Sequence, residues 1–300
     1  MNIDLAPFER LAMVSTNAKL SEYTTFKIGG KAKLIAAPQD ADALAGLIAE
    51  CKKQDVPYFI LGAGSNLLVA DEGVDAVVIY TGAMSSIKIE GNIITAQAGA
   101  TLSTVCRKAA REGLAGMEFA FGIPGSVGGG VFMNAGAYGG ELKDILLSVT
   151  VLTEDGKLVT YDAAECDFSY RHSRFQKEKA VVIEAKFKLE KGDMDEVVAQ
   201  MKDIIARRKE KQPLEYPSAG SAFKRPVGAF AGGLIEQCGL KGFSVGGAMV
   251  SEKHAGFIIN YDHATCEDTC KLFMEVQRIV KEQTGYHLEP EVLLLGREWK

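Results

Sequence analysis

Three polar side chains at distant positions of the chain could together handle a proton and a carboxylate. Ser221 lies among serines, a glycine and two cations, between the prolines that bound residues 217–226. Arg171 lies in the polar residues 168–173, and a guanidinium binds a carboxylate through two parallel hydrogen bonds. Glu291 opens a run of apolar residues where a carboxylate can be partly buried. A surface turn, a surface cation and a solvated strand end remain the plainer interpretations.

Three glycine-rich segments could bind an anionic cofactor. They are residues 62–66, 122–130 and 134–140. Glycines let backbone N–H groups approach an anion closely, and Ser65 and Asn66 add neutral donors. The first segment lacks the third glycine of the dinucleotide fingerprint, and the chain has no Walker sequence. One such segment is more often a tight turn, but three together favour a pyrophosphate with a flat ring at each end.

A mixture of helices and strands must position these groups. Apolar periodicity and capping residues predict helices over residues 40–54, 101–113, 193–211, 233–236 and 265–284. Short apolar or alternating runs predict strands over residues 57–61, 77–80, 180–189, 257–259 and 292–295, and hairpins over residues 87–95 and 149–161. The fold class expected from this mixture is α+β.

Composition and charge exclude several classes of protein. The 300 residues are 47% hydrophobic and 24% charged, which is typical of a folded enzyme. The net charge of −5 lacks the broad positive field that nucleic-acid binding requires, so no nucleic-acid partner is expected. The N-terminus has no basic start followed by an apolar run, and no stretch reaches the ~18 apolar residues of a membrane span. We therefore expect a cytoplasmic protein without a membrane partner.

The six cysteines are too few for a disulfide framework. Cys51 and Cys106 lie on the apolar stripes of predicted helices, which indicates core packing. Cys266 and Cys270 share a helical face, but no second Cys or His pair completes a zinc site. No metal is expected.

Seven stretches resemble one family in their order and spacing. They are residues 23–30 (YTTFKIGG), 61–68 (LGAGSNLL), 122–129 (GIPGSVGG), 134–139 (NAGAYG), 170–171 (YR), 219–224 (AGSAFK) and 288–292 (LEPEV). The chain resembles the UDP-N-acetylenolpyruvoylglucosamine reductases, flavoenzymes of peptidoglycan precursor synthesis, from about residue 20 to residue 297. It is similar to the shorter form of that family, because residues 174–190 hold no inserted tyrosine-bearing loop.

The resemblance implies an α+β protein in two parts. An FAD-binding domain of the vanillyl-alcohol-oxidase type would span residues 1–200, in subdomains 1–82 and 83–200, and an α+β substrate-binding domain would span residues 201–300. It implies FAD as cofactor, NADPH as reductant and a UDP-sugar as substrate, whose enolpyruvyl group is reduced to give UDP-N-acetylmuramate. The residues that it assigns to FAD are Gly62, Ala63, Gly64, Ser65, Asn66, Gly122, Ile123, Pro124, Gly125, Ser126, Gly128, Gly129, Asn134, Ala135 and Gly136.

The resemblance also implies roles at the substrate. Ser221 would be the general acid that protonates the enolate carbon, and Arg171 and Glu291 would stabilise the enolate and its carboxylate. Lys211 and Arg225 would reach the UDP phosphates. His254 would face the same pocket, although a surface histidine is an equally good interpretation.

Two other functions remain open. Another FAD oxidoreductase on the same scaffold, such as a sugar or alcohol oxidase, would consume oxygen instead of an enolpyruvyl substrate. A non-catalytic nucleotide-binding protein would be colourless when purified.

Overall fold

The computed structural model describes residues 3–299, which fold into two compact units. Unit 1 comprises the described chain up to Ser15, Leu34–Ala63 and Ala76–Arg207. Unit 2 comprises Thr16–Lys33, Gly64–Asp75 and the described chain from Arg208 onwards. The chain thus enters unit 2 twice before its C-terminal third, whereas the sequence predicts uninterrupted domains. The assignment of FAD and substrate binding to residues 1–200 and 201–300 stays a prediction.

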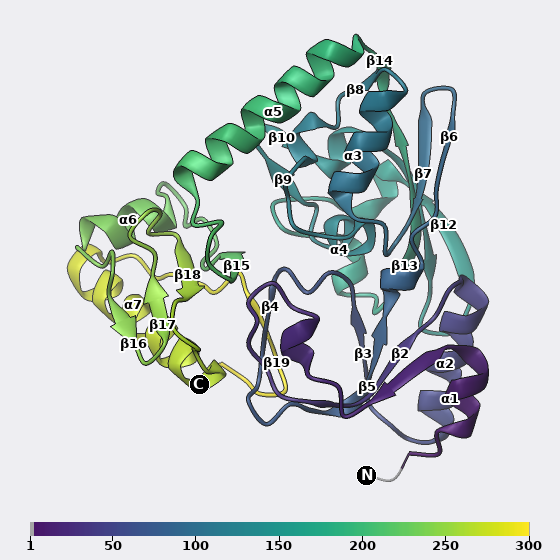
Figure 1. The fold of residues 1–300 in the computed structure, drawn as a ribbon, viewed down its shortest axis with the longest axis horizontal. Helices are drawn as coiled ribbons and strands as arrows, with labels where there is room; N and C mark the ends of the chain where they lie inside the picture. Colours follow the sequence, from purple (N-terminus) through teal and green to yellow (C-terminus); the bar gives the residue numbers. More distant parts are fainter. Residues whose placement is uncertain (1–2, 300) are drawn as a thin grey trace. The chain divides into compact units, whose positions relative to one another are not determined.

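A four-stranded sheet, most of it in unit 1, has the strand order β1-β2-β5-β3 (Figure 1). Its strands are β1 (Met13–Thr16), β2 (Ala32–Ala37), β3 (Tyr58–Leu61) and β5 (Val74–Tyr80), and its helices are α1 (Ala6–Leu11) and α2 (Ala41–Lys53). The helices and the sheet share one buried core. Asp40 caps α2 by accepting a hydrogen bond from the N–H of Ala43 at 2.8 Å, so this helix begins where the sequence predicts.

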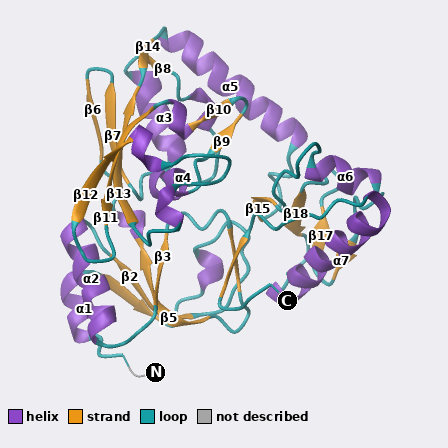
Figure 2. Ribbon diagram, turned by 180° about the vertical axis from the view of Figure 1, so that it is seen from behind, coloured by secondary structure: helices purple, strands orange, loops and turns teal. Residues whose placement is uncertain are grey.

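The second sheet of unit 1 is antiparallel and has the strand order β12-β11-β13-β7-β6. Its strands are β6 (Ile87–Glu90), β7 (Ile93–Gln97), β11 (Leu146–Leu152), β12 (Leu158–Asp162) and β13 (Val181–Lys188). Both predicted hairpins are present. The helices α3 (Leu102–Arg111) and α4 (Val127–Phe132) lie on one face of the sheet (Figure 2). The remaining elements are β8 (Leu114–Ala115) paired with β14 (Glu190–Lys191), β9 (Gly136–Ala137) paired with β10 (Gly140–Glu141), and α5 (Met194–Lys211), which passes into unit 2 at Arg208.

Residues 122–130 are predicted to form one loop, and this is wrong for their second half. Helix α4 begins at Val127, after Ser126, whose Oγ accepts a hydrogen bond from the N–H of Gly129 at 3.4 Å. Each glycine in a helix interior costs roughly 1 kcal/mol relative to alanine. Helix propensity therefore disfavours α4, and another interaction must offset this cost.

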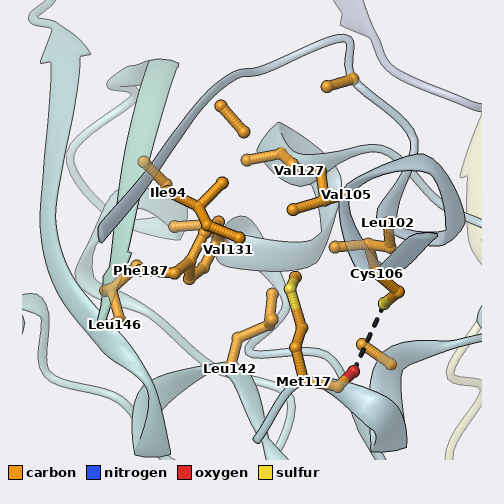
Figure 3. Packing of buried hydrophobic residues seen from close by; sticks show 14 of the residues in the cluster. Ile94, Leu102, Val105, Cys106, Met117, Val127, Val131, Leu142, Leu146 and Phe187 are labelled. Atoms are coloured by element: carbon orange, nitrogen blue, oxygen red, sulfur yellow. Dashed lines mark hydrogen bonds between the residues drawn. The ribbon is translucent and has the colours of Figure 1, made fainter. Parts of the chain in front are cut away.

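Close packing explains the glycine-rich helix. A Cβ atom on Gly128 would lie 2.9 Å from the Cβ of Ala98, and one on Gly130 would lie 2.9 Å from a methyl group of Leu142. Only glycine lets α4 approach its neighbours this closely. The approach buries the two valines of α4 among the side chains of α3 and of the sheet (Figure 3).

Unit 2 contains an antiparallel sheet with the strand order β15-β18-β17-β16. Its strands are β15 (Ser218–Ser221), β16 (Ser244–Val245), β17 (Ala248–Val250) and β18 (Phe257–Asn260), and its helices are α6 (Ala231–Gln237) and α7 (Cys266–Thr284). A parallel pair joins β4 (Leu67–Val69) to β19 (Leu293–Leu295). Residues 217–226, interpreted from the sequence as a loop, thus contain a strand.

Two further expectations concern the burial of two cysteines and the presence of helices that could cross a membrane. Cys51 and Cys106 are buried as predicted, and burial raises the pKa of both thiols to about 12. Among residues 3–299, no helix combines the length and apolar character needed to cross a membrane.

Candidate active site

A pocket of about 280 Å³ lies in unit 1 where β3 and β5 end. It offers hydroxyl groups, backbone amides and one tyrosine ring, and its lining has no charged side chain. The lining residues are Gly62, Ala63, Tyr80, Gly82, Ser85, Ile87, Gly99, Ala100, Thr101, Thr104 and Ser126.

Glycines are required in the wall of this pocket. A Cβ atom on Gly62 would lie 2.5 Å from the Oγ of Ser126, and one on Gly99 would lie 1.9 Å from the carbonyl oxygen of Thr81. A bare backbone lets a ligand approach the N–H groups closely. Neutral donors without carboxylates fit the ribose, phosphate and ring parts of a dinucleotide, and they offer little to a metal ion.

The pocket shares only some residues with the predicted cofactor set. Gly62, Ala63 and Ser126 belong to both. The sequence did not reveal the hydroxyl groups of Thr101 and Thr104, because the caps and first turn of a helix look the same whether or not a pocket adjoins them.

Most predicted cofactor residues of residues 122–136 make backbone hydrogen bonds within unit 1. The N–H of Gly122 donates to Ser103 Oγ at 3.2 Å, and the N–H of Ile123 donates to the carbonyl oxygen of Ala120 at 3.1 Å. The N–H of Ala135 donates to the carbonyl oxygen of Gly130 at 2.8 Å, and the carbonyl oxygen of Gly125 accepts from the N–H of Leu102 at 3.0 Å. Gly136 pairs with Glu141 in the β9–β10 hairpin. Pro124 and Gly129 are exposed and Gly128 is half-buried. Their contact with a cofactor stays a prediction.

The second half of the first glycine segment belongs to unit 2. Gly64 has φ 60°, and a Cβ atom there would lie 2.2 Å from the carbonyl oxygen of Tyr23. The backbone N–H groups of Gly64, Ser65 and Asn66 have no protein acceptor among residues 3–299. Successive unpaired N–H groups around a left-handed residue can bind an anion.

Side chains tie this glycine segment to the two predicted catalytic stretches of unit 2. Asn66 donates from Nδ2 to the carbonyl oxygen of Glu291 at 3.0 Å, and its own carbonyl oxygen accepts from the N–H of Leu293 at 3.0 Å. Thr25 donates from Oγ1 to the carbonyl oxygen of Ser218 at 2.7 Å. The N–H of Thr25 donates to the carbonyl oxygen of Gly64 at 3.2 Å. The backbone of residues 64–66 is therefore fixed to the strands beside it.

Ser221 and Glu291 come together through the backbone. The N–H of Glu291 donates to the carbonyl oxygen of Ala222 at 2.8 Å, so the residue after Ser221 is bonded directly to Glu291. An irregularity in the pairing of β15, where Gly220 has φ 77°, re-aims the serine relative to a regular strand. Both side chains are half-buried.

The three residues predicted to bind substrate outside the catalytic set lie in unit 2. Lys211 and Arg225 are exposed, and the Arg225 guanidinium lies 4.6 Å from the ring centroid of Phe230. His254 is half-buried, and its Nδ1 accepts a hydrogen bond from the N–H of Gly256 at 3.1 Å. Burial lowers the pKa of His254, so the neutral ring is favoured.

Arg171 lies in unit 1, at the third position of a tight turn. Ser169 and His172 exchange backbone hydrogen bonds at 3.2 Å, and Arg171 has φ 54°. A left-handed backbone costs roughly 1–2 kcal/mol for a residue other than glycine or asparagine. Its guanidinium lies 5.3 Å from the ring centroid of Tyr170.

Asn134 fastens this turn to the end of α4. Its Nδ2 donates to the carbonyl oxygen of Ser169 at 3.0 Å and to a carboxylate oxygen of Glu141 at 2.8 Å. Its Oδ1 accepts from the N–H of Lys143 at 3.1 Å. The side chain is 1% exposed and fully engaged, so only its backbone is left for the predicted cofactor contact.

Charges around the turn favour an ionised Glu141. A hydrogen bond from Lys143 lowers the pKa of this carboxyl group most, a second from Asn134 adds to it, and the positive charge of Arg171 contributes. Unit 1 thus holds the arginine beside a fixed negative charge.

Comparison with known proteins places the chain in a family. An FAD binding domain matches residues 32–162, and the C-terminal domain of UDP-N-acetylenolpyruvoylglucosamine reductase matches residues 212–295. The reductase of Caldanaerobacter subterraneus subsp. tengcongensis is 47% identical over 94% of this chain and 93% of its own. The chain belongs to the UDP-N-acetylenolpyruvoylglucosamine reductase family.

Other members of this family agree over almost the whole chain. The reductase of Syntrophomonas wolfei is 46% identical over 98% of both chains. The crystal structure of the reductase from Thermus caldophilus superposes with a TM-score of 0.80 and 36% identity, covering 95% of this chain and 98% of that one. The predicted α+β fold class and the predicted FAD cofactor are confirmed by these matches.

Proposed function

We propose that this chain uses NADPH and FAD to reduce UDP-N-acetylglucosamine-enolpyruvate to UDP-N-acetylmuramate, with Ser221, Arg171 and Glu291 acting on the substrate. The observation that carries the proposal is that the segment of Ser221 is hydrogen-bonded to the segment of Glu291. Two polar residues from motifs far apart in the sequence are joined by the hydrogen bond from Glu291 N to Ala222 O, beside an anion-binding glycine segment.

In unit 1, the residues that would hold FAD line the pocket. In unit 2, the N–H groups of residues 64–66 would bind an anionic group. FAD, when bound, supplies the hydride that it has taken from NADPH. The hydroxyl groups of Ser85, Thr101 and Thr104 would hydrogen-bond its polar groups, and the glycine backbone would bind its phosphates.

Ser221 donates a proton to the substrate. Hydride addition to the enolpyruvyl double bond leaves an enolate, which is strongly basic at carbon. A serine hydroxyl is a weak acid in water, but it can protonate so strong a base when it is held at the right distance. The backbone of β15 and its irregularity at Gly220 hold the hydroxyl in place.

Arg171 and Glu291 act on the carboxylate of the same substrate. Negative charge develops on the carboxylate oxygens as the hydride arrives, and a fixed guanidinium offsets that charge best where water is excluded. The backbone N–H and carbonyl oxygen of Glu291 both make hydrogen bonds within unit 2, which fixes the position of its Cα.

Lys211 and Arg225 belong to the proposal as ligands of the UDP phosphates, and His254 as a residue that faces the same pocket. The two exposed cations supply positive charge, and the neutral His254 has Nε2 left as a donor because Nδ1 accepts from Gly256. The proposal includes a cytoplasmic location, where NADPH is available, and no nucleic-acid or membrane partner.

An anaerobic absorbance titration of the purified protein tests this function. The protein is expected to be yellow, NADPH is expected to bleach the flavin band, and UDP-N-acetylglucosamine-enolpyruvate is expected to restore it in stoichiometric amounts. A colourless protein that binds no FAD would reject the proposal. So would a reduced flavin that oxygen reoxidises but the enolpyruvyl nucleotide does not, which is the result for a sugar or alcohol oxidase.

A further inference from the structure

Arg171 has a backbone conformation that arginine rarely adopts. A tight turn that requires φ > 0 at its third position normally has glycine or asparagine there. Arginine at φ 54° persists only if the surroundings hold it. Strain of this kind is often found at functional sites.

Gln176 makes the contact closest to the strained residue. It ends a short 3-10 turn (Arg174–Gln176) directly after the Arg171 turn. Its Nε2 donates to the carbonyl oxygen of Arg171 at 2.9 Å and to the carbonyl oxygen of Phe132 at 2.9 Å. One amide thus ties the peptide that follows Arg171 to the last residue of α4.

Ser173 shares one of these two contacts. Its Oγ donates to the same carbonyl oxygen of Phe132 at 2.8 Å, and its side chain is fully buried. Ser173 therefore attaches the segment to α4 without a side-chain contact to Arg171. A Ser173 variant therefore loses a bond between this segment and α4 but keeps the bond from Gln176 to the backbone of Arg171.

The opposite side of the turn is fixed by Asn134 through the carbonyl oxygen of Ser169. The turn is thus held from both sides by side-chain amides, one before Arg171 and one after it. Of these two amides, that of Asn134 bonds Ser169 and that of Gln176 bonds Arg171 itself.

We propose that Gln176 is a positioning residue that holds Arg171 in its left-handed conformation and so aims the guanidinium at the substrate carboxylate. The inference rests on the proposed function for the role of the guanidinium. Loss of both Gln176 bonds lets the peptide after Arg171 rotate towards an ordinary conformation, which swings the Cα–Cβ bond and displaces the guanidinium. Displacement by about 1 Å is enough to reduce a rate by roughly 100-fold.

Gln176→Met is the first test, because methionine keeps the length of the side chain and removes both donors. In stopped-flow experiments, flavin reduction by NADPH is expected to stay within about twofold of the wild-type rate. Reoxidation by UDP-N-acetylglucosamine-enolpyruvate is expected to fall by roughly 10- to 100-fold. Ser173→Ala is the matched control and is expected to change reoxidation by less than about threefold. Equal losses in both variants would overturn the inference.

A double-mutant cycle separates positioning from general structural support. Arg171→Ala slows reoxidation on its own, and adding Gln176→Met to it is expected to cost less than about twofold more, because no guanidinium remains to be aimed. A further 10-fold loss in the Arg171→Ala background would show that Gln176 acts elsewhere and would overturn the inference.

A crystal structure of Gln176→Met tests the inference without any activity. Arg171 is expected at negative φ or in more than one conformation. Retention of φ near 54° would overturn the inference. If wild-type enzyme is not reoxidised by the enolpyruvyl nucleotide, the proposed function fails, and this structure alone decides whether Gln176 holds the Arg171 backbone.

Discussion

The Arg171 turn in unit 1 and the Ser221–Glu291 pair in unit 2 are held by different kinds of bond. Side-chain amides of Asn134 and Gln176 fix the Arg171 turn. Backbone hydrogen bonds fix the other pair, from Glu291 to Ala222 and from Ala222 to Gly256 at 2.8 Å each. A backbone bond survives most substitutions, whereas a side-chain bond depends on one residue type. The Arg171 turn is therefore the more vulnerable of the two.

Asn134→Ala is expected to destabilise the protein strongly. The substitution removes the hydrogen bonds of the Asn134 side chain to Ser169, Glu141 and Lys143, and each such bond contributes about 1 kcal/mol. We expect the free energy of unfolding, measured by urea denaturation, to fall by roughly 2–4 kcal/mol. A loss below about 1 kcal/mol would mean that water replaces the amide and that the turn does not depend on it.

Asn66→Ala is the matched substitution in unit 2, and a smaller effect is expected. It removes the hydrogen bond from Nδ2 to the carbonyl oxygen of Glu291, but the backbone bonds from Leu293 to Asn66 and from Glu291 to Ala222 remain. The same urea experiment should give a loss of about 1 kcal/mol. If this variant is destabilised as much as Asn134→Ala, the two regions do not differ in the way described.

His254 gives the smallest effect, through pH. Burial lowers its pKa below the ordinary 6.5, so the folded protein favours the neutral ring and the unfolded chain binds more protons below pH 6.5. The stability contributed by this residue is present above pH 6.5 and is lost as the pH falls below that value. Protonation would also turn Nδ1 from the acceptor of the Gly256 N–H into a donor.

The pH effect is measured as the difference in Tm between pH 7.5 and pH 5. It is expected to be smaller in His254→Gln than in the wild-type protein. An equal difference in both proteins would show that His254 does not contribute to acid destabilisation.

The sequence predicts the elements whose signal is local. The long helix α7 has an apolar stripe, a Thr265 cap and Gly285 at its end with φ 77°, and α2 has a comparable stripe with an Asp40 cap. The hairpin between β11 and β12 follows from alternation around Asp155 and Gly156. These residues suffice because the signal and the structure lie within the same few residues.

Features that depend on distant partners are not visible in the sequence. Helix α4 contradicts its own propensity, because close packing against Ala98 and Leu142 requires its glycines. The parallel pairing of β4 with β19 joins segments at opposite ends of the chain. The hydrogen bonds of Gln176 leave no sequence pattern, since a glutamine beside a lysine is typical of any surface.

The candidate site likewise has features that the sequence predicts and features that only the structure shows. The resemblance implies Ser221, Arg171 and Glu291. The structure adds the hydrogen bond from Glu291 to Ala222, which links the segments of Ser221 and Glu291. It also shows that the side chain of Asn134 braces the Arg171 turn, which its place in a glycine-rich motif did not suggest.

Single-turnover kinetics of Ser221→Ala decide whether this site works as proposed. The variant is to be reduced with NADPH in the absence of oxygen and then mixed with UDP-N-acetylglucosamine-enolpyruvate. We expect flavin reduction at the wild-type rate and reoxidation slowed by roughly 10²–10⁴-fold, the usual loss for a missing general acid. Reoxidation at the wild-type rate would remove Ser221 from proton transfer, and with it the mechanism built on the Ser221–Glu291 pair.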